Sequence, residues 1–305
     1  MGRRSRPSAA HCRPIGLNVV GSMPLLMHIA FDNSRRLRRR VYYFEYRDVC
    51  FKLIQNEPRK WADVLLTIIP KDDSSAQEKV YAAAGQFLSA LSWQNSSRVA
   101  LQNLGGHGVP HSFRLRQARC RSFTFPQVPF SGKVTGYNIS PIAAIESEAQ
   151  RLALALFREA FSCNKVLLSF LLYWQILETD GTDPVGWINK TLNRPTGFHV
   201  PTSDIRQLPL GAKKVGEYLL DECRHAIAHI RRWPGSTSLK FDVGAESMRL
   251  LISTRVVEQF ARHYIKNVLG LRGEMCLVRK KGRGFPVFVD AAYLHHHHCV
   301  PAYKA

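Results

Sequence analysis

The sequence predicts an α+β protein, in which a small mixed domain over residues 25–140 precedes an all-helical domain over residues 141–272. Three observations lead to this prediction. Apolar residues alternate with polar ones in the first half, as on strands, and recur every three to four residues in the second half, as on helices. Prolines and glycines crowd the stretch between the two halves. The hydrophobic fraction of 45% over 305 residues is enough for packed cores.

The first domain is expected to begin with strands. Residues 41–46 and 49–54 are rich in aromatic and β-branched side chains and flank Arg47-Asp48, which predicts a hairpin. Residues 64–69 predict a further strand, because they form a short apolar run that a proline ends.

A helix and a glycine segment follow these strands. Residues 76–91 carry an apolar face at helical spacing, and Ser74 or Ser75 is expected to cap the helix. The glycine segment 105–108 is predicted to be a plain loop, because Pro110 prevents the helix that a phosphate cradle needs after its loop.

The second domain is predicted to contain three helical stretches. Residues 156–177 carry apolar side chains at alternating steps of four and three, which predicts one long helix or two helices that meet near Cys163. Residues 217–232 are patterned as an amphipathic helix. The last helix is expected over residues 246–269, with Gly270 placed to cap it.

Residues 217–232 also form the candidate functional site. On a helix, one stripe faces the core, and its members are Val215, Leu219, Cys223, Ala226, Ile227 and Ile230. Asp221, His225 and His229 form a row along the edge of this stripe. Arg224 lies about 140° from His229 on a straight helix. The two side chains therefore meet only if the helix breaks, the arginine curls around, or a second protomer completes the site.

The order Arg224-x4-His229 resembles the Arg-x4–6-His motif of HEPN domains, which are all-helical, usually dimeric modules and often metal-independent ribonucleases. The resemblance implies that the histidine acts as general base or acid on the ribose 2′-hydroxyl, and that the arginine stabilises charge on the phosphorane. Arg224, His225 and His229 are accordingly the candidate catalytic residues. It also implies a possible homodimer. A purely structural role for the three residues is the alternative.

A second resemblance is carried by blocks of the helical half, at residues 154–160, 170–171, 175–178, 223–229 and 264–271. In their order and spacing these blocks resemble the methylamine utilization protein MauJ family. The resemblance covers roughly residues 40–270. It implies a place in the gene cluster of methylamine dehydrogenase, the quinoprotein that oxidises methylamine to formaldehyde and ammonia, but it does not imply a reaction.

The two ends of the chain, which depart from that family, carry much of the formal net charge of +20. Residues 1–40 hold nine arginines against one aspartate, a net +8, and residues 271–305 hold six basic against two acidic residues, a net +4. Residues 1–24 are therefore predicted to be a basic flexible arm, and residues 273–305 a basic, His-rich, disordered tail. A truncation to residues 25–274 is expected to keep its thermal midpoint. Attraction of the ends to RNA, DNA or an anionic membrane is the alternative.

Cysteine usage and hydropathy bear on location. The seven cysteines are scattered singly without a C-x-x-C pair, which favours reduced thiols and a cytoplasmic protein. The apolar run 166–177 is shorter than the ~20 residues that a bilayer needs, so no membrane segment is predicted. Gly21, Ser22 and Pro24 interrupt the apolar stretch that a signal peptide would require.

Neither a metal nor a cofactor is predicted. His225 and His229 could share a cation, with Asp221 or Glu222 as a third ligand, but the H-E-x-x-H arrangement of helical zinc sites is absent. The run His295–His298 could bind Ni²⁺ or Zn²⁺ adventitiously. None of the five tryptophans has a context that indicates a quinone cofactor.

These observations favour an accessory or regulatory protein of methylamine utilization that has no catalysis of its own. A HEPN-type metal-independent ribonuclease is the alternative. A third possibility is a protein that binds RNA through its basic surface without cleaving it.

Overall fold

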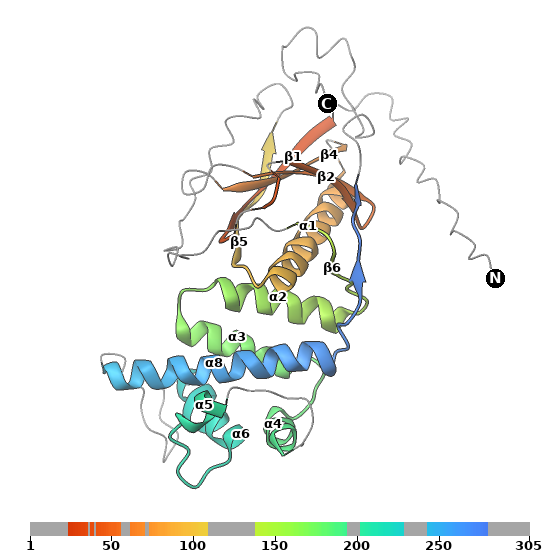
Figure 1. The fold of residues 1–305 in the computed structure, drawn as a ribbon. Coiled ribbons are helices and arrows are strands. Elements are labelled where there is room, and N and C mark those ends of the chain that lie inside the picture. Colours follow the sequence, from red (N-terminus) through yellow and green to blue (C-terminus); the bar gives the residue numbers. More distant parts are fainter. Residues whose placement is uncertain are drawn as a thin grey trace, which may run out of the picture.

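The α+β class is confirmed by the computed structural model, in which an antiparallel sheet lies at one end of the molecule and stacked helices at the other (Figure 1). The structure describes residues 24–35, 37–39, 41–55, 62–70, 73–108, 138–193, 202–228 and 243–279. The strands from the first half of the chain are β1 (Pro24–Asn33), β2 (Val41–Tyr46), β3 (Val49–Ile54), β4 (Asp63–Pro70) and β5 (Val99–Gly108). With β8 (Val278–Arg279) they form one sheet in the order β5-β1-β4-β3-β2-β8, antiparallel at every pairing.

The predicted hairpin between β2 and β3 is confirmed. Arg47 and Asp48 form its two-residue turn, with φ values of 52° and 58°. Positive φ at both turn positions is the geometry whose twist matches the right-handed twist of the flanking strands. The strand predicted over residues 64–69 is also confirmed, as β4.

Two features of the sheet differ from expectation. β1 was not predicted, although it lies between β4 and β5, and its residues from Met27 to Asp32 are all buried. The glycine segment 105–108, predicted as a plain loop, instead continues β5 up to Gly108. Its pairing with β1 shifts register between His28 and Ile29, an irregularity that glycines accommodate well.

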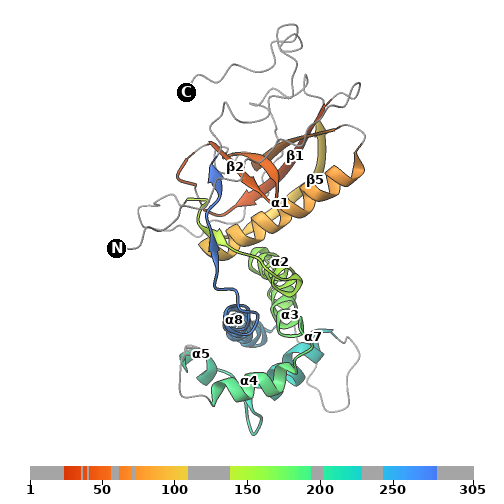
Figure 2. The same cartoon turned by 90° about the vertical axis from the view of Figure 1, so that its right-hand side faces the viewer.

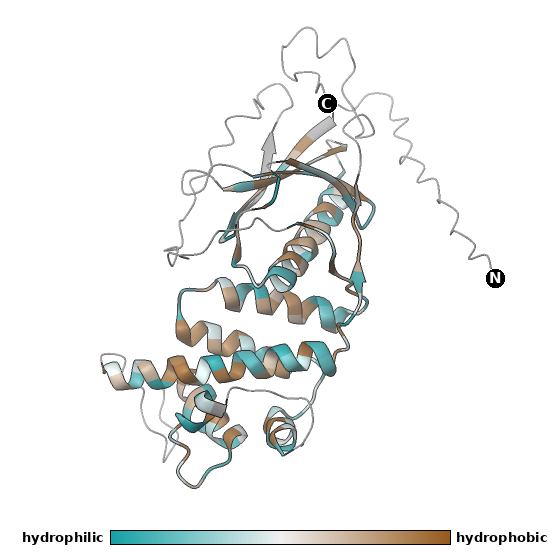
Figure 3. Ribbon diagram, viewed as in Figure 1, coloured by the Kyte–Doolittle hydropathy of each residue, from teal (hydrophilic) through white to brown (hydrophobic). Residues whose placement is uncertain are grey.

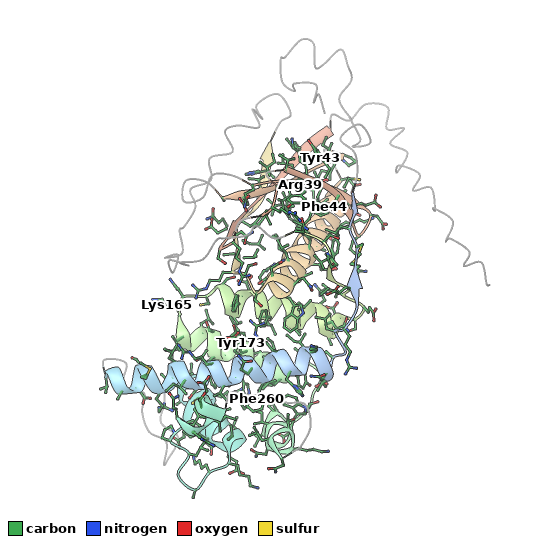
Figure 4. All side chains as sticks on the ribbon, viewed as in Figure 1. Arg39, Tyr43, Phe44, Lys165, Tyr173 and Phe260 are labelled. Atoms are coloured by element: carbon green, nitrogen blue, oxygen red, sulfur yellow. The ribbon has the colours of Figure 1, made fainter. Side chains whose placement is uncertain are left out.

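Helix α1 (Ser74–Asn95) packs on the sheet and leads away from it to the helical layers (Figure 2). Asp73, and not either of the predicted serines, caps it by accepting a hydrogen bond from the Ala76 amide at 2.9 Å. On its buried face, the ring of Phe87 lies 4.6 Å from that of Phe44 on β2. Phe44 marks the sheet layer in Figure 4, where Tyr173 and Phe260 mark the helical layers.

Of the two alternatives for residues 156–177, the break near Cys163 is confirmed. α2 (Glu148–Ser162) and α3 (Val166–Leu177) form a helical hairpin, and Ser147 and Gln150 make a capping box at its start. The last predicted helix is α8 (Gly244–Asn267), which lies beside α3 (Figures 1 and 2). Gly270 follows it with a φ of 70°, as a C-cap glycine requires. Apolar and polar residues alternate along α2 and α8 (Figure 3).

Two short helices were not predicted, α4 (Pro184–Leu192) and α5 (Thr202–Arg206). α4 packs closely on the first turn of the candidate site. A Cβ atom added at Gly216 would lie 2.7 Å from the Val185 carbonyl oxygen, so only glycine fits there without movement. The Gly216 amide donates to the Asn189 side chain at 3.0 Å.

The predicted start of the C-terminal tail needs correction. β7 (Glu274–Met275) pairs with β6 (Ile142–Ala143), and β8 pairs with β2. Leu277, which lies between β7 and β8 in the sequence, is buried. A truncation to residues 25–274 would remove β8, so we now expect it to lower the thermal midpoint. Residues 1–23 and 280–305 lie outside the described residues.

Candidate functional site in a π-helical segment

The candidate site consists of α6 (Val215–Tyr218), the π-helix η2 (Leu219–His225) and α7 (Ala226–Ala228). A helix was predicted here, but seven of its residues take the wider π form, whose hydrogen bonds span five residues in place of four. The angle of about 140° between Arg224 and His229 assumed α-helical geometry. That assumption does not hold over Leu219–His225, and His229 itself lies outside the described residues.

The buried stripe is confirmed at its first three positions. Val215, Leu219 and Cys223 are buried, while Ala226 and Ile227 are half-buried. A four-residue step stays close to one face in the wider π turn, which keeps Leu219 and Cys223 on the same side. Ile230 lies outside the described residues.

Arg249 of α8 anchors this segment. Its guanidinium donates to the Tyr218 hydroxyl at 2.8 Å, to the Cys223 sulfur at 3.5 Å and to the Glu222 carbonyl oxygen at 3.3 Å. It also forms an ion pair with Glu246, one turn earlier on α8, with Nε and Oε2 2.8 Å apart. One half-buried cation therefore ties three positions of the site to the neighbouring helix.

The electrostatics of this cluster argue against thiolate chemistry. Burial raises the pKa of the Cys223 thiol, and the nearby guanidinium only partly offsets this. Burial likewise raises the pKa of the Tyr218 hydroxyl. For Arg249, burial opposes the charge, but the hydrogen bonds to Glu246 and Tyr218 raise the pKa. The arginine stays charged and the thiol stays protonated near neutral pH.

The two acidic residues of the site are paired by Lys213. Its ammonium lies 2.7 Å from a carboxylate oxygen of Glu222 and 3.1 Å from one of Asp221. These hydrogen bonds, first that to Glu222, raise the pKa of Lys213. Asp221 or Glu222 was the third ligand considered for a cation shared by His225 and His229, of which His229 lies outside the described residues. Across the described ranges, no three His, Cys, Asp or Glu side chains gather closely enough to hold a metal ion.

Of the three candidate catalytic residues, two can be placed. Arg224 and His225 are adjacent at the end of η2, and both side chains are half-buried. Sequence reasoning missed Lys213, Tyr218 and Arg249. The Glu246-x-x-Arg249 spacing indicates an ion pair on one helix, but nothing in the sequence indicates that this pair faces η2.

Comparison with known protein families matches residues 153–266 to the family described as methylamine utilization protein MauJ. The matched region runs from α2 almost to the end of α8 and includes the π-helical segment. It confirms the predicted resemblance to this family over these residues, whereas the predicted extension back to about residue 40 lies outside the match. The likeness to HEPN domains stays a prediction. Searches of curated proteins and of solved structures gave no match. In the part of the chain that the structure describes, no helix is both long and apolar enough to cross a membrane.

Proposed function

We propose that this chain, whose residues 153–266 match the MauJ family, is an accessory or regulatory protein of methylamine utilization. The family match carries this proposal. It covers most of α2 and α8 and the helices between them, so the part that resembles the family is also the part that contains the candidate site.

The contacts of the π-helical segment support a binding or regulatory role. Its acids are paired with Lys213, its thiol is buried, and Arg249 holds both the tyrosine that precedes the π-helix and a carbonyl within it. These groups stabilise the segment. Arg224 and His225 are half-buried at the end of the segment, where they could contact a partner.

A clean deletion in the organism that carries the gene tests the proposal. We expect slower growth on methylamine and lower methylamine dehydrogenase activity, with normal growth on a carbon source that bypasses this enzyme. Wild-type protein should restore both. Unchanged growth and unchanged dehydrogenase activity in the deletion strain would rule the proposal out.

The π-helix favours one second candidate, a HEPN-type metal-independent ribonuclease, because π-turns occur frequently at functional sites. Arg224, His225 and His229 would then act on RNA, with a homodimer able to complete the site from two protomers. An RNA-binding protein without cleavage is the weaker form of this candidate.

An RNA cleavage assay without divalent metal separates these possibilities. The ribonuclease candidate predicts cleavage by wild type and none by Arg224→Ala or His229→Ala at equal folded concentration. Absence of cleavage at high concentration of a stable monomer excludes it. Retention of RNA on the wild-type protein without cleavage would favour binding alone.

We also propose a cytoplasmic location, on the strength of the seven unpatterned cysteines. Fractionation of cells that express the full chain tests it. Recovery of the protein with periplasmic markers would contradict it.

A further inference from the structure

Arg262 of α8 lies in a cage of aromatic rings at the junction of three helices. The centre of its guanidinium is 4.6 Å from the ring centroid of Phe157, 5.4 Å from that of Phe161 and 5.9 Å from that of Trp93. Phe157 and Phe161 belong to α2 and stack on each other, and Trp93 of α1 meets Phe157 edge-on at 5.0 Å. All three rings are thus within the range over which an aromatic face attracts a cation.

Glu258 is an acidic partner of the caged guanidinium, and part of the cage is exposed to solvent. Arg262 Nε donates to the Glu258 carboxylate at 2.9 Å, and the two side chains are 25% and 21% exposed. Trp93 and Phe161 are half-buried, so the rim of the cage reaches solvent. Several rings with one nearby carboxylate at a solvent-accessible rim match the chemistry by which proteins recognise organic ammonium ions.

The contacts between the Arg262 guanidinium and the rings impose little directional constraint on the cation. Attraction to ring faces tolerates shifts of the cation, and the ion pair with Glu258 is partly exposed and screened. Replacement of the guanidinium by another monovalent organic cation keeps the charge balance beside Glu258. The long arginine side chain can reach solvent from a half-exposed position on α8.

We propose that this cage binds a small alkylammonium ion, with methylammonium as the first candidate, in exchange with the guanidinium of Arg262. The choice of methylammonium rests on the proposed function. Methylamine is a primary alkylamine and so is protonated near neutral pH, as a lysine side chain is. Four of the five cage residues, all but Trp93, lie within the region that matches the family. Exchange would release Arg262 from α1 and α2, which connects ligand binding to the packing of α8.

Nuclear magnetic resonance of ¹³C-methylammonium tests the proposal on the full chain. A methyl group above the Phe157 ring is expected to shift upfield through the ring current, a signature that a change of stability alone does not produce. Arg262→Met removes the competing cation and should strengthen binding by about tenfold or more. In wild type only the fraction of molecules whose cage is free of Arg262 can bind the ligand, which lowers the apparent affinity by that fraction. Arg255→Met, at an exposed arginine of the same helix, should bind as wild type does.

Two variants lower binding if the cage is correct. Glu258→Gln in the Arg262→Met background removes the carboxylate, and Phe161→Leu in the same background removes a ring. Both should weaken binding, and ammonium chloride at matched ionic strength should not compete as methylammonium does.

Each other outcome overturns the proposal. Absence of an upfield shift with Arg262→Met means that the cage does not take alkylammonium ions. Binding to Arg262→Met but not to wild type means that Arg262 is a permanent structural occupant. Neither result bears on growth of the deletion strain on methylamine, so the accessory role and the cage stand or fall separately.

Discussion

Arg249 and Arg262 lie on the same helix and each pairs with a glutamate one turn earlier, yet their surroundings differ. Arg249 faces hydrogen-bond acceptors from the π-helical segment, namely a hydroxyl, a sulfur and a backbone carbonyl. Arg262 faces three aromatic rings and the carboxylate of Glu258. Directional hydrogen bonds fix a guanidinium in one position, whereas ring faces attract any cation of suitable size. The comparison assigns Arg249 to the architecture of the site and Arg262 to an exchangeable contact.

The largest effect is expected from Arg249→Met. The substitution leaves Glu246, the Tyr218 hydroxyl and the Glu222 carbonyl without their shared donor, and we expect the free energy of unfolding to fall by about 2–4 kcal/mol. Urea unfolding measures it. Arg255→Met on the same helix is the control and should stay within about 0.5 kcal/mol of wild type. A loss no larger than that of the control would mean that Arg249 is not an anchor.

The next largest loss of stability is expected at Gly216, which lies in the first turn of the candidate site that Arg249 anchors. Gly216→Ala places a Cβ against the Val185 carbonyl oxygen, so α4 must move away from α6. We expect the free energy of unfolding to fall by about 1–3 kcal/mol. Gly85→Ala in α1 has open space around the added atom and removes helical glycine, so it should stabilise by up to about 1 kcal/mol. The thermal midpoint should therefore fall in Gly216→Ala and rise in Gly85→Ala. Equal shifts of the midpoint would show that α4 does not pack tightly against α6.

Arg262→Met should cost less than either destabilising change. Loss of a half-buried cation over aromatic rings and of its partly exposed ion pair is expected to lower the free energy of unfolding by about 0.5–1.5 kcal/mol, since methionine keeps the apolar stem of the arginine side chain. Urea unfolding, run beside Arg249→Met, measures the difference. A loss equal to that of Arg249→Met would erase the distinction between the two arginines.

Thiol labelling probes the difference between Arg249 and Arg262 by a measurement other than unfolding. Cys276 is exposed, and it should be alkylated readily between about pH 7 and about pH 9. Cys223 should stay protected over this range, because it is buried and burial raises its pKa, which keeps the thiolate fraction small. Arg249→Met should expose Cys223 to label, and Arg262→Met should not. Mass spectrometry of the labelled peptides reads the outcome, and equal labelling of Cys223 in both variants would contradict the account.

Periodic elements of the fold were predictable from the sequence. The β2–β3 hairpin, α1 and α8 all combine a clear apolar period with turn or cap residues, so local chemistry and burial agree. β1 escaped prediction because its residues from Met27 to Asp32 are buried on both faces of a strand between two others, which erases the alternation that marks a half-buried strand.

Other features depend on long-range contacts that no local pattern encodes. The local sequence around glycines 105 and 106 predicts a loop, but pairing with β1 extends β5 through them. β8 joins a strand more than 200 residues earlier in the chain, which the basic composition of the C-terminal end concealed. The role of Arg249 depends on the position of α8 beside the segment. The amphipathic pattern around Arg224 predicted a helix but not its π form.

Spectra of the arginine Nε–H groups test the contrast between Arg249 and Arg262 most directly, with assignments from Arg249→Met and Arg262→Met. We expect the Arg249 signal to exchange slowly with solvent and to keep its position when methylammonium is added, because its bonds are directional and partly buried. The Arg262 signal should move progressively in the same titration as its guanidinium leaves the cage. Two unmoved signals, or two that move together, would contradict the assignment of one arginine to the architecture and the other to exchange.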